Sequence, residues 1–191
     1  MALVKYNNNS ISSVTALGSL PAGGLNLITT NTISSGVSSS DFTSSIDSTY
    51  DTYLFKFINM HPATATAEFQ FQGNADGESG FNETMTTSLF QTYHYEDSSY
   101  TSLNYRTSHD QAQGTAYQSI SDDITNDADG SCSGYLYYFH HLTQPLLHIL
   151  YQELILTDTI QLDLQILNFV VVILIRLQLL MKLVLKCLAE I

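Results

Sequence analysis

Residues 53–72 read YLFKFINMHPATATAEFQFQ, and this stretch decides the fold class. Its first part, Tyr53 to Met60, is almost continuously apolar, is rich in aromatic and β-favouring residues, and stops at His61-Pro62. In its second part, Ala63 to Gln72, alanine and phenylalanine alternate strictly with polar residues. Alternation with a period of two places one face of a strand against the core and the other in water. We therefore predict two strands, which the short His61-Pro62 connection should make antiparallel neighbours.

Further strand-like runs follow at short intervals. They are separated by loops rich in Gly, Asn, Asp and Ser, and helical periodicity is absent from this part of the sequence. The runs are residues 86–95, 99–106, 114–120 and 134–137. This spacing predicts an all-β protein, β-sandwich or jelly-roll-like.

Composition divides the chain into three parts. Residues 1–52 are dominated by Ser, Thr, Asn and Gly and are expected to form an arm and the first strands. Residues 53–137 are the β-sandwich body. Residues 138–191 form an apolar tail in which, from Phe139 onward, 16 Leu, 7 Ile and 4 Val replace the Gly and Ser of the body. Because this tail does not match the body, we expect the sandwich to be incomplete. The tail should pack poorly against the body and should not supply the final strands of the sandwich.

The charge of the chain excludes one class of partner. The formal net charge is −12, and the body up to Tyr137 holds only three basic residues, Lys5, Lys56 and Arg106. Cations this few and this far apart do not form the basic stripe that neutralises phosphates, so no nucleic acid is expected as a partner. Cys132 and Cys187 are isolated and have no disulfide or metal-ligand spacing.

The tail does not resemble a membrane span. Its longest uncharged run, Leu164 to Ile175, has 12 residues, includes Gln165 and Asn168, and is followed by Arg176. A membrane-spanning helix needs roughly 20 apolar residues. No membrane association is expected, and Met1 to Ser13 lacks the basic start and apolar run of a secretory signal.

A change of reading frame explains the tail better. Tyr137 to Gln144 can be encoded as TAT TAT TTT CAT CAT CTA ACA CAA. Starting at the last base of the Tyr137 codon, the same letters encode LFSSSNT, which has the Ser/Thr/Asn character of the body. Permitted codons continue this frame to the end without a stop. We therefore interpret residues 138–191 as out-of-frame translation, with a genuine apolar segment as the alternative.

The sequence contains no convincing catalytic or metal-binding pattern. The six His residues lack metal-ligand spacing, and GxSxG is absent. The run from Gln72 to Gly77, with Glu83, matches a calcium loop only in part. Asp122, Asp123, Asp127 and Asp129 are expected to form a solvated turn, with a Ca²⁺ site between strands as the alternative. We expect no enzyme activity, no cofactor and no metal site.

Four tyrosines are candidate ligand-contact residues. Tyr93, Tyr95, Tyr100 and Tyr105 fall in two neighbouring strand-like runs. Tyrosine offers a flat apolar face with a polar tip, which suits sugars and proteins. Cross-strand packing is the alternative explanation for these residues.

Several stretches resemble a family of small proteins from marine tailed bacteriophages. They are MALVKYNNNSISSVTALGSLPAGG (residues 1–24), DSTYDTYLFKFINMHPAT (47–64), AQGTAYQ (112–118) and NDADGSCSGYLY (126–137). The resemblance covers the whole body and ends after Tyr137. It implies a virion-associated structural protein with a β-sandwich fold, made in the host bacterial cytoplasm. Its partners would be other virion proteins and copies of itself, or, as a receptor-binding module, host-surface glycans.

Overall fold

The computed structural model describes residues 24–75, 78–95, 97–128, 130–139, 148–157, 164–174 and 180–187, the last three ranges as backbone only. The chain divides into two compact units, Met1–Thr30 and Asn31–Ile191. In the first unit, the described residues 24–30 have no regular secondary structure. All the described strands belong to the second unit.

The described part of the chain is all-β, as predicted. Its one helical element is a 3-10 turn, η1 (Thr107–His109). The strands are β1 (Ser39–Phe42), β2 (Thr52–Met60), β3 (Ala67–Ala75), β4 (Met85–Tyr95), β5 (Thr101–Tyr105), β6 (Gln111–Gly114), β7 (Gln118–Ile124), β8 (Ser131–Phe139), β9 (His148–Thr157), β10 (Leu164–Leu174) and β11 (Leu180–Cys187).

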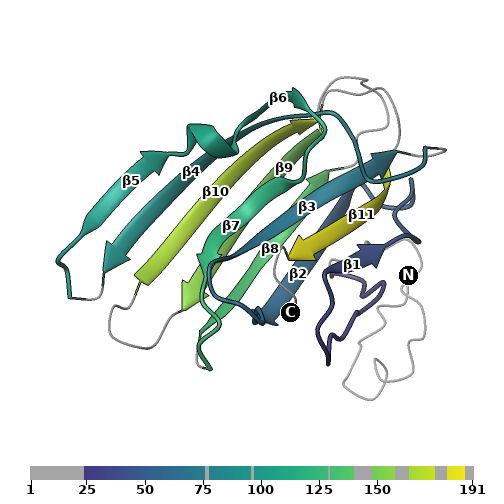
Figure 1. Ribbon diagram of the computed structural model, residues 1–191. Coiled ribbons are helices and arrows are strands. Elements are labelled where there is room, and N and C mark those ends of the chain that lie inside the picture. The colour runs from purple at the N-terminus through teal and green to yellow at the C-terminus, as the bar shows by residue number, and fades with distance from the viewer. Residues whose placement is uncertain are drawn as a thin grey trace, which may run out of the picture. The chain divides into compact units, whose positions relative to one another are not determined.

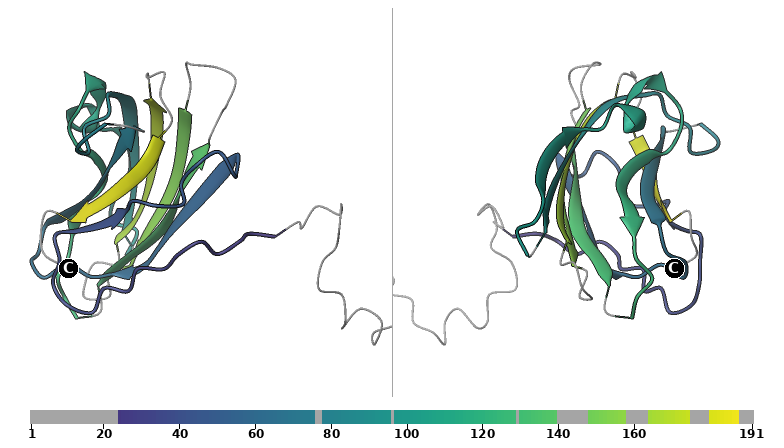
Figure 2. Two further views of the ribbon diagram at one scale, coloured as in Figure 1. Left: turned by 90° about the vertical axis from the view of Figure 1, so that its right-hand side faces the viewer. Right: turned by 60° about the vertical axis from the view of Figure 1, so that its left-hand side comes forward.

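These strands form two facing sheets, as Figures 1 and 2 show. The four-stranded sheet has the order β1-β11-β3-β7. The seven-stranded sheet has the order β2-β8-β9-β10-β4-β5, with β6 also paired to β4. Within each sheet every described strand pairing is antiparallel.

The pairings follow a nested pattern. β1 pairs with β11, β2 with β8, β3 with β7, and β4 with β5. Successive pairs alternate between the two sheets. A long hairpin rolled up in this way is a jelly roll, the double Greek-key arrangement. The hairpin of β9 and β10 is inserted between β8 and β4, which widens one sheet.

The predicted strands around His61-Pro62 both exist, but the prediction that they pair is wrong. β2 lies in the seven-stranded sheet and β3 in the four-stranded sheet. Both strands carry large aromatic side chains on their buried faces, and these meet across the core: the ring centroids of Phe57 and Phe69 are 5.0 Å apart in an edge-to-face arrangement. With β2 and β3 in different sheets, their apolar faces pack against each other across the core. In a hairpin both apolar faces would lie on the same side of one sheet and would need another layer to cover them.

The tail contributes strands to both sheets, contrary to the expectation that it would lack them. β9 and β10 occupy interior positions of the larger sheet, and β11 lies between β1 and β3. The Leu, Ile and Val that dominate these segments favour extended backbone, and ladder hydrogen bonds are made by the backbone whatever the side chain. The described part of the chain contains no helix with the length and hydropathy of a membrane span.

The core lies between the two sheets. It is built from alternate residues of the strands on either side, among them Tyr53, Phe55 and Phe57 of β2, Phe69 and Phe71 of β3, Met85 and Leu89 of β4, Ile120 of β7, and Leu136 and Tyr138 of β8. Because odd-numbered residues of β4 and even-numbered residues of β8 face this core, the residues between them face outward. This alternation determines which side chains of β4 and β8 are exposed on the outward face of the seven-stranded sheet.

Candidate binding surface

The exposed end of the seven-stranded sheet is formed by β4 and β5. In β4 the side chains of Leu89 and Gln91 are buried, so Phe90 between them faces away from the core. The register places Tyr105 directly opposite Phe90 and Leu103 opposite Thr92, on the same outward face. Phe90, Leu103 and Tyr105 are 40%, 71% and 51% exposed. We call these three residues the Phe90 patch.

The Phe90 patch has a defined geometry. The rings of Phe90 and Tyr105 are stacked, with centroids 5.0 Å apart and an interplanar angle of 25°. The Tyr105 hydroxyl donates to Asp110 Oδ2, and Asp110 Oδ1 accepts the backbone N–H of Leu89 at 3.1 Å. The hydrogen bond to Asp110 raises the pKa of Tyr105, because the carboxylate favours the protonated phenol. The patch therefore presents the Tyr105 ring, held by stacking on Phe90, with a carboxylate bonded to its hydroxyl.

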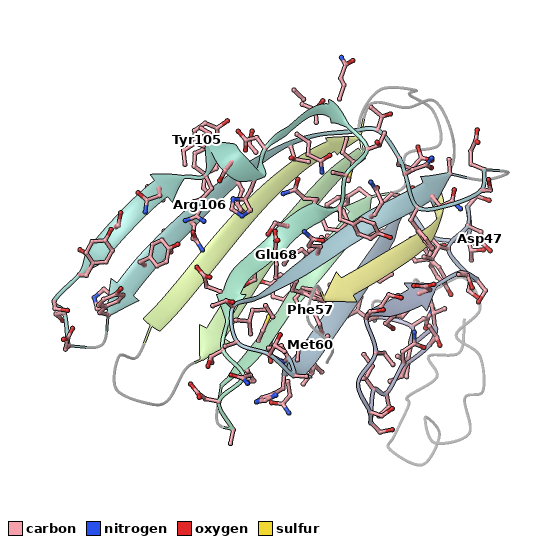
Figure 3. All side chains as sticks on the ribbon, viewed as in Figure 1. Asp47, Phe57, Met60, Glu68, Tyr105 and Arg106 are labelled. Atoms are coloured by element: carbon pink, nitrogen blue, oxygen red, sulfur yellow. The ribbon has the colours of Figure 1, made fainter. Side chains whose placement is uncertain are left out.

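Arg106 follows the patch in the chain and ties β5 to the inner side of the sheet. Its backbone N–H donates to Leu89 O at 2.9 Å, and its guanidinium donates to the Tyr93 hydroxyl at 3.2 Å. The Tyr93 hydroxyl in turn donates to Gln91 Oε1. Figure 3 shows Tyr105 and Arg106 next to each other where β5 ends.

The four tyrosines predicted as ligand contacts do not form one group. Tyr100 packs against both Tyr93 and Tyr95, with ring centroids 6.5 and 5.3 Å apart. These three lie where β4 turns into β5, and Tyr93 also packs against the core. Tyr105 stands apart on the outward face, in the Phe90 patch. The strand parity of Tyr93 and Tyr105 separates them, because the two residues lie on opposite faces of the sheet.

A second aromatic row lies on β8 and was not singled out from the sequence. Tyr135, Tyr137 and Phe139 alternate with the buried Leu136 and Tyr138, so they face outward. Tyr137 packs edge-to-face on Tyr135 at 5.5 Å and stacks with Phe139 at 6.0 Å. The run SCSGYLYYF contains the signal, but the outward set could be recognised only once the core had identified the inward set. We call Tyr135, Tyr137 and Phe139 the β8 row.

A buried polar network holds the loop that supports the Phe90 patch. Gln118 is fully buried, its Oε1 accepts the Thr87 hydroxyl at 2.5 Å, and its Nε2 donates to His109 O at 3.2 Å. Thr87 Oγ1 accepts the backbone N–H of Gln111 at 2.9 Å. These bonds fasten one side of Asp110 to β7 and the other to β4, and so hold the carboxylate that bonds the Tyr105 hydroxyl.

Histidines and acidic residues serve local roles where the structure describes them. His61 Nε2 lies 2.7 Å from Asp127 O, and His109 Nε2 lies 3.9 Å from the Glu68 carboxylate. Asp127 accepts the Thr125 hydroxyl at 2.7 Å within its own turn. Among the described residues, no three His, Cys, Asp or Glu side chains gather into a group that could hold a metal ion.

The described part of the partial calcium-loop pattern, Gln72 to Ala75, lies on β3 and not in a loop. The Glu83 carboxylate accepts the backbone N–H of Ala75 at 2.8 Å, and Gln72 Nε2 donates to Ala116 O at 2.9 Å. These polar groups fasten the 78–84 and 115–118 segments to the end of β3.

Comparison with known proteins adds no relative to this description. No protein-family model, curated protein or solved structure matches the chain.

Proposed function

We propose that this chain is a non-enzymatic structural or decorating protein of a bacteriophage particle and acts through protein–protein contacts of an oligomeric jelly roll. The observation that carries the proposal is the outward face of the seven-stranded sheet. This face presents Ile58 of β2 at 73% exposure, Phe139 of the β8 row, and the Phe90 patch. Of these, the Phe90 patch brings three exposed side chains together, and exposed apolar patches are typical of interaction surfaces.

The fold and the sequence resemblance support the same role. Jelly rolls form viral capsid domains and also lectins, so the fold agrees with a particle protein but does not assign one. The phage assignment comes from the stretches in residues 1–24, 47–64, 112–118 and 126–137 that resemble virion-associated proteins. The protein would be made in the host bacterial cytoplasm and reside in the virion.

Purified particles provide the test. We expect mass spectrometry to find this chain in particles from an infected culture, and the double variant Ile58→Ser/Phe139→Ser to be depleted from them. Thr64→Ala, a change in the exposed connection between β2 and β3, should leave incorporation unchanged. A chain that stays in the lysate and never enters particles would overturn the proposal.

The Phe90 patch favours a second candidate, a receptor-binding module for host glycans. A stacked, exposed Tyr105 with the Asp110 carboxylate at its hydroxyl resembles the aromatic platforms that bind sugar rings. On a glycan array, Tyr105→Ala should abolish binding, whereas Tyr137→Ala on the β8 row should not. Hydrolysis of any polysaccharide by the purified protein would contradict both candidates.

A further inference from the structure

β5 ends the seven-stranded sheet, and its backbone groups alternate between two sides. Tyr95 N donates to Tyr100 O at 3.0 Å, and Arg106 N donates to Leu89 O at 2.9 Å. In an antiparallel strand, alternate residues direct their N–H and C=O groups to opposite sides. Even-numbered residues from 100 to 106 therefore face β4, and Thr101, Leu103 and Tyr105 direct their backbone groups away from it. No strand in the described part of the chain pairs with that side.

This edge lacks the features that normally protect sheet edges. Natural edges carry lysine, proline or inward charges that prevent another strand from adding. The sequence of β5, TSLNY, has none of these, and its middle residue, Leu103, is 71% exposed. In a chain with a net charge of −12, residues 98–109 contain no acidic residue and one basic residue, Arg106. The strand itself therefore offers no carboxylate that would repel an added strand.

We propose that β5 pairs antiparallel with β5 of a second copy, about a twofold axis at Leu103. This inference rests on the proposed function, in which the jelly roll is oligomeric, and names the contact between two copies. In this register Leu103 faces the partner's Leu103, and Thr101 faces the partner's Tyr105. The residues whose backbone groups point away from β4 thus lie opposite each other in the two copies. Three residue pairs can therefore exchange N–H···O bonds.

The side chains also match in this register. On the outward face the two Leu103 side chains meet at the axis and connect the two Phe90 patches into one apolar band. On the inner face Ser102 lies opposite the partner's Asn104, a neutral polar pair. Beyond the strand, Arg106 lies opposite the partner's Tyr100, which is 47% exposed and offers a ring face to a cation. A self-complementary strand favours a second copy over an unrelated partner.

The mass of the full chain in solution tests the proposal. Sedimentation equilibrium should give twice the 21.2 kDa of one chain. Leu103→Pro should give a monomer that stays folded, because the lost N–H points away from β4. Leu103→Lys should do the same. Thr64→Lys, a change in the exposed connection between β2 and β3, should remain a dimer.

A cross-linking experiment tests the register itself. A hydrogen-bonded antiparallel pair has Cα atoms about 5.5 Å apart, within the range of about 4.4–6.8 Å that a disulfide spans. Under mild oxidation Leu103→Cys should therefore form a covalent dimer on a non-reducing gel. Ser102→Cys, which faces the partner's Asn104 instead of itself, should give no more dimer than the wild-type chain.

Two results would overturn the proposal: a wild-type chain that sediments as a monomer, or a Leu103→Pro dimer as stable as the wild type. Incorporation into particles is measured separately. A dimeric chain that is absent from particles would overturn the proposed function and leave the β5 contact standing. A monomeric chain present in particles would do the reverse.

Discussion

Tyr53 joins the core to the connection that precedes β2. Its hydroxyl donates to Asp47 O at 2.7 Å and accepts the backbone N–H of Asp47 at 3.0 Å. Its ring is buried and packs on Tyr138 with centroids 6.1 Å apart. Burial raises the pKa of Tyr53, because the ionised phenolate would lose its hydration. One phenol thus bonds both the N–H and the C=O of Asp47.

We expect Tyr53→Phe to lower the free energy of unfolding by about 1–2 kcal/mol, the usual cost of removing such hydrogen bonds. Because the folded pKa is raised, the contribution of the protonated hydroxyl is complete below the unfolded pKa of about 10 and is lost as the pH rises through the folded value. Urea unfolding between neutral pH and pH ~11 measures both effects. A variant with the wild-type pH dependence would contradict this assignment.

The fully buried Gln118 gives a second prediction at this scale. Gln118→Ala removes the acceptor of Thr87 and the donor to His109 O. We expect a loss of about 2–4 kcal/mol, because buried polar groups are left unpaired and a cavity forms. Gln70→Ala, at a half-buried glutamine of β3, should cost less than about 1 kcal/mol in the same urea titration. Equal losses would argue against the network.

Among the connections between elements, the one from β2 to β3 departs most clearly from a simple turn. Its last residue, Thr66, has φ 58°, a left-handed conformation in which a β-branched side chain is strained. This residue directs the chain from one sheet into the other.

We expect Thr66→Asn to stabilise the protein by about 0.5–1 kcal/mol, because asparagine tolerates the left-handed region. Thr64→Asn is the matched control: it lies in the same connection and has no positive φ. The urea midpoint of Thr66→Asn should rise while that of Thr64→Asn stays within about 0.5 kcal/mol of the wild type. Destabilisation at Thr66 would show that its hydroxyl, 2.7 Å from Ala65 O, outweighs the strain.

The sequence predicts strands better than it predicts their partners. The alternation in residues 63–72 depends on local burial, and β3 covers much of that run. The pairing of β2 depends on β8, more than 70 residues later, and no local pattern specifies it. Of the Phe90 patch only Tyr105 was predicted, and Phe90 and Leu103 were missed for a related reason. Which of Phe90 and Tyr93 faces outward follows from the position of the core, and the sequence does not reveal that position.

At the scale of the whole molecule, the tail presents a contrast between its composition and its position. Residues 139–191 lack the Gly and Ser of the body, yet their strands occupy interior positions in both sheets. The shifted frame predicts a polar string that begins LFSSSNT at the same place. Backbone pairing places the tail strands in the sheets whatever their side chains are. The strand positions are therefore compatible with our interpretation that the side chains come from a shifted reading frame.

The reading frame is directly testable. We expect the coding DNA, read from the last base of the Tyr137 codon, to encode LFSSSNT and to continue without a stop to the end. Restoring one base there should give a more soluble product, because apolar side chains not selected for this core favour aggregation. A shifted frame that encodes any other string, or equal solubility of the two products, would establish the apolar tail as a genuine element.

The interior position of the last strands also determines when the protein can fold. β8 and β4 acquire their neighbours β9 and β10, and β3 acquires β11, only after more than three quarters of the chain has left the ribosome. Until then the nascent chain exposes unpaired strand edges that can recruit other chains. Because the nested pairings join residues far apart in sequence, their formation is also slow. Neither sheet of this jelly roll can therefore be completed before the strands β9 to β11 have been made.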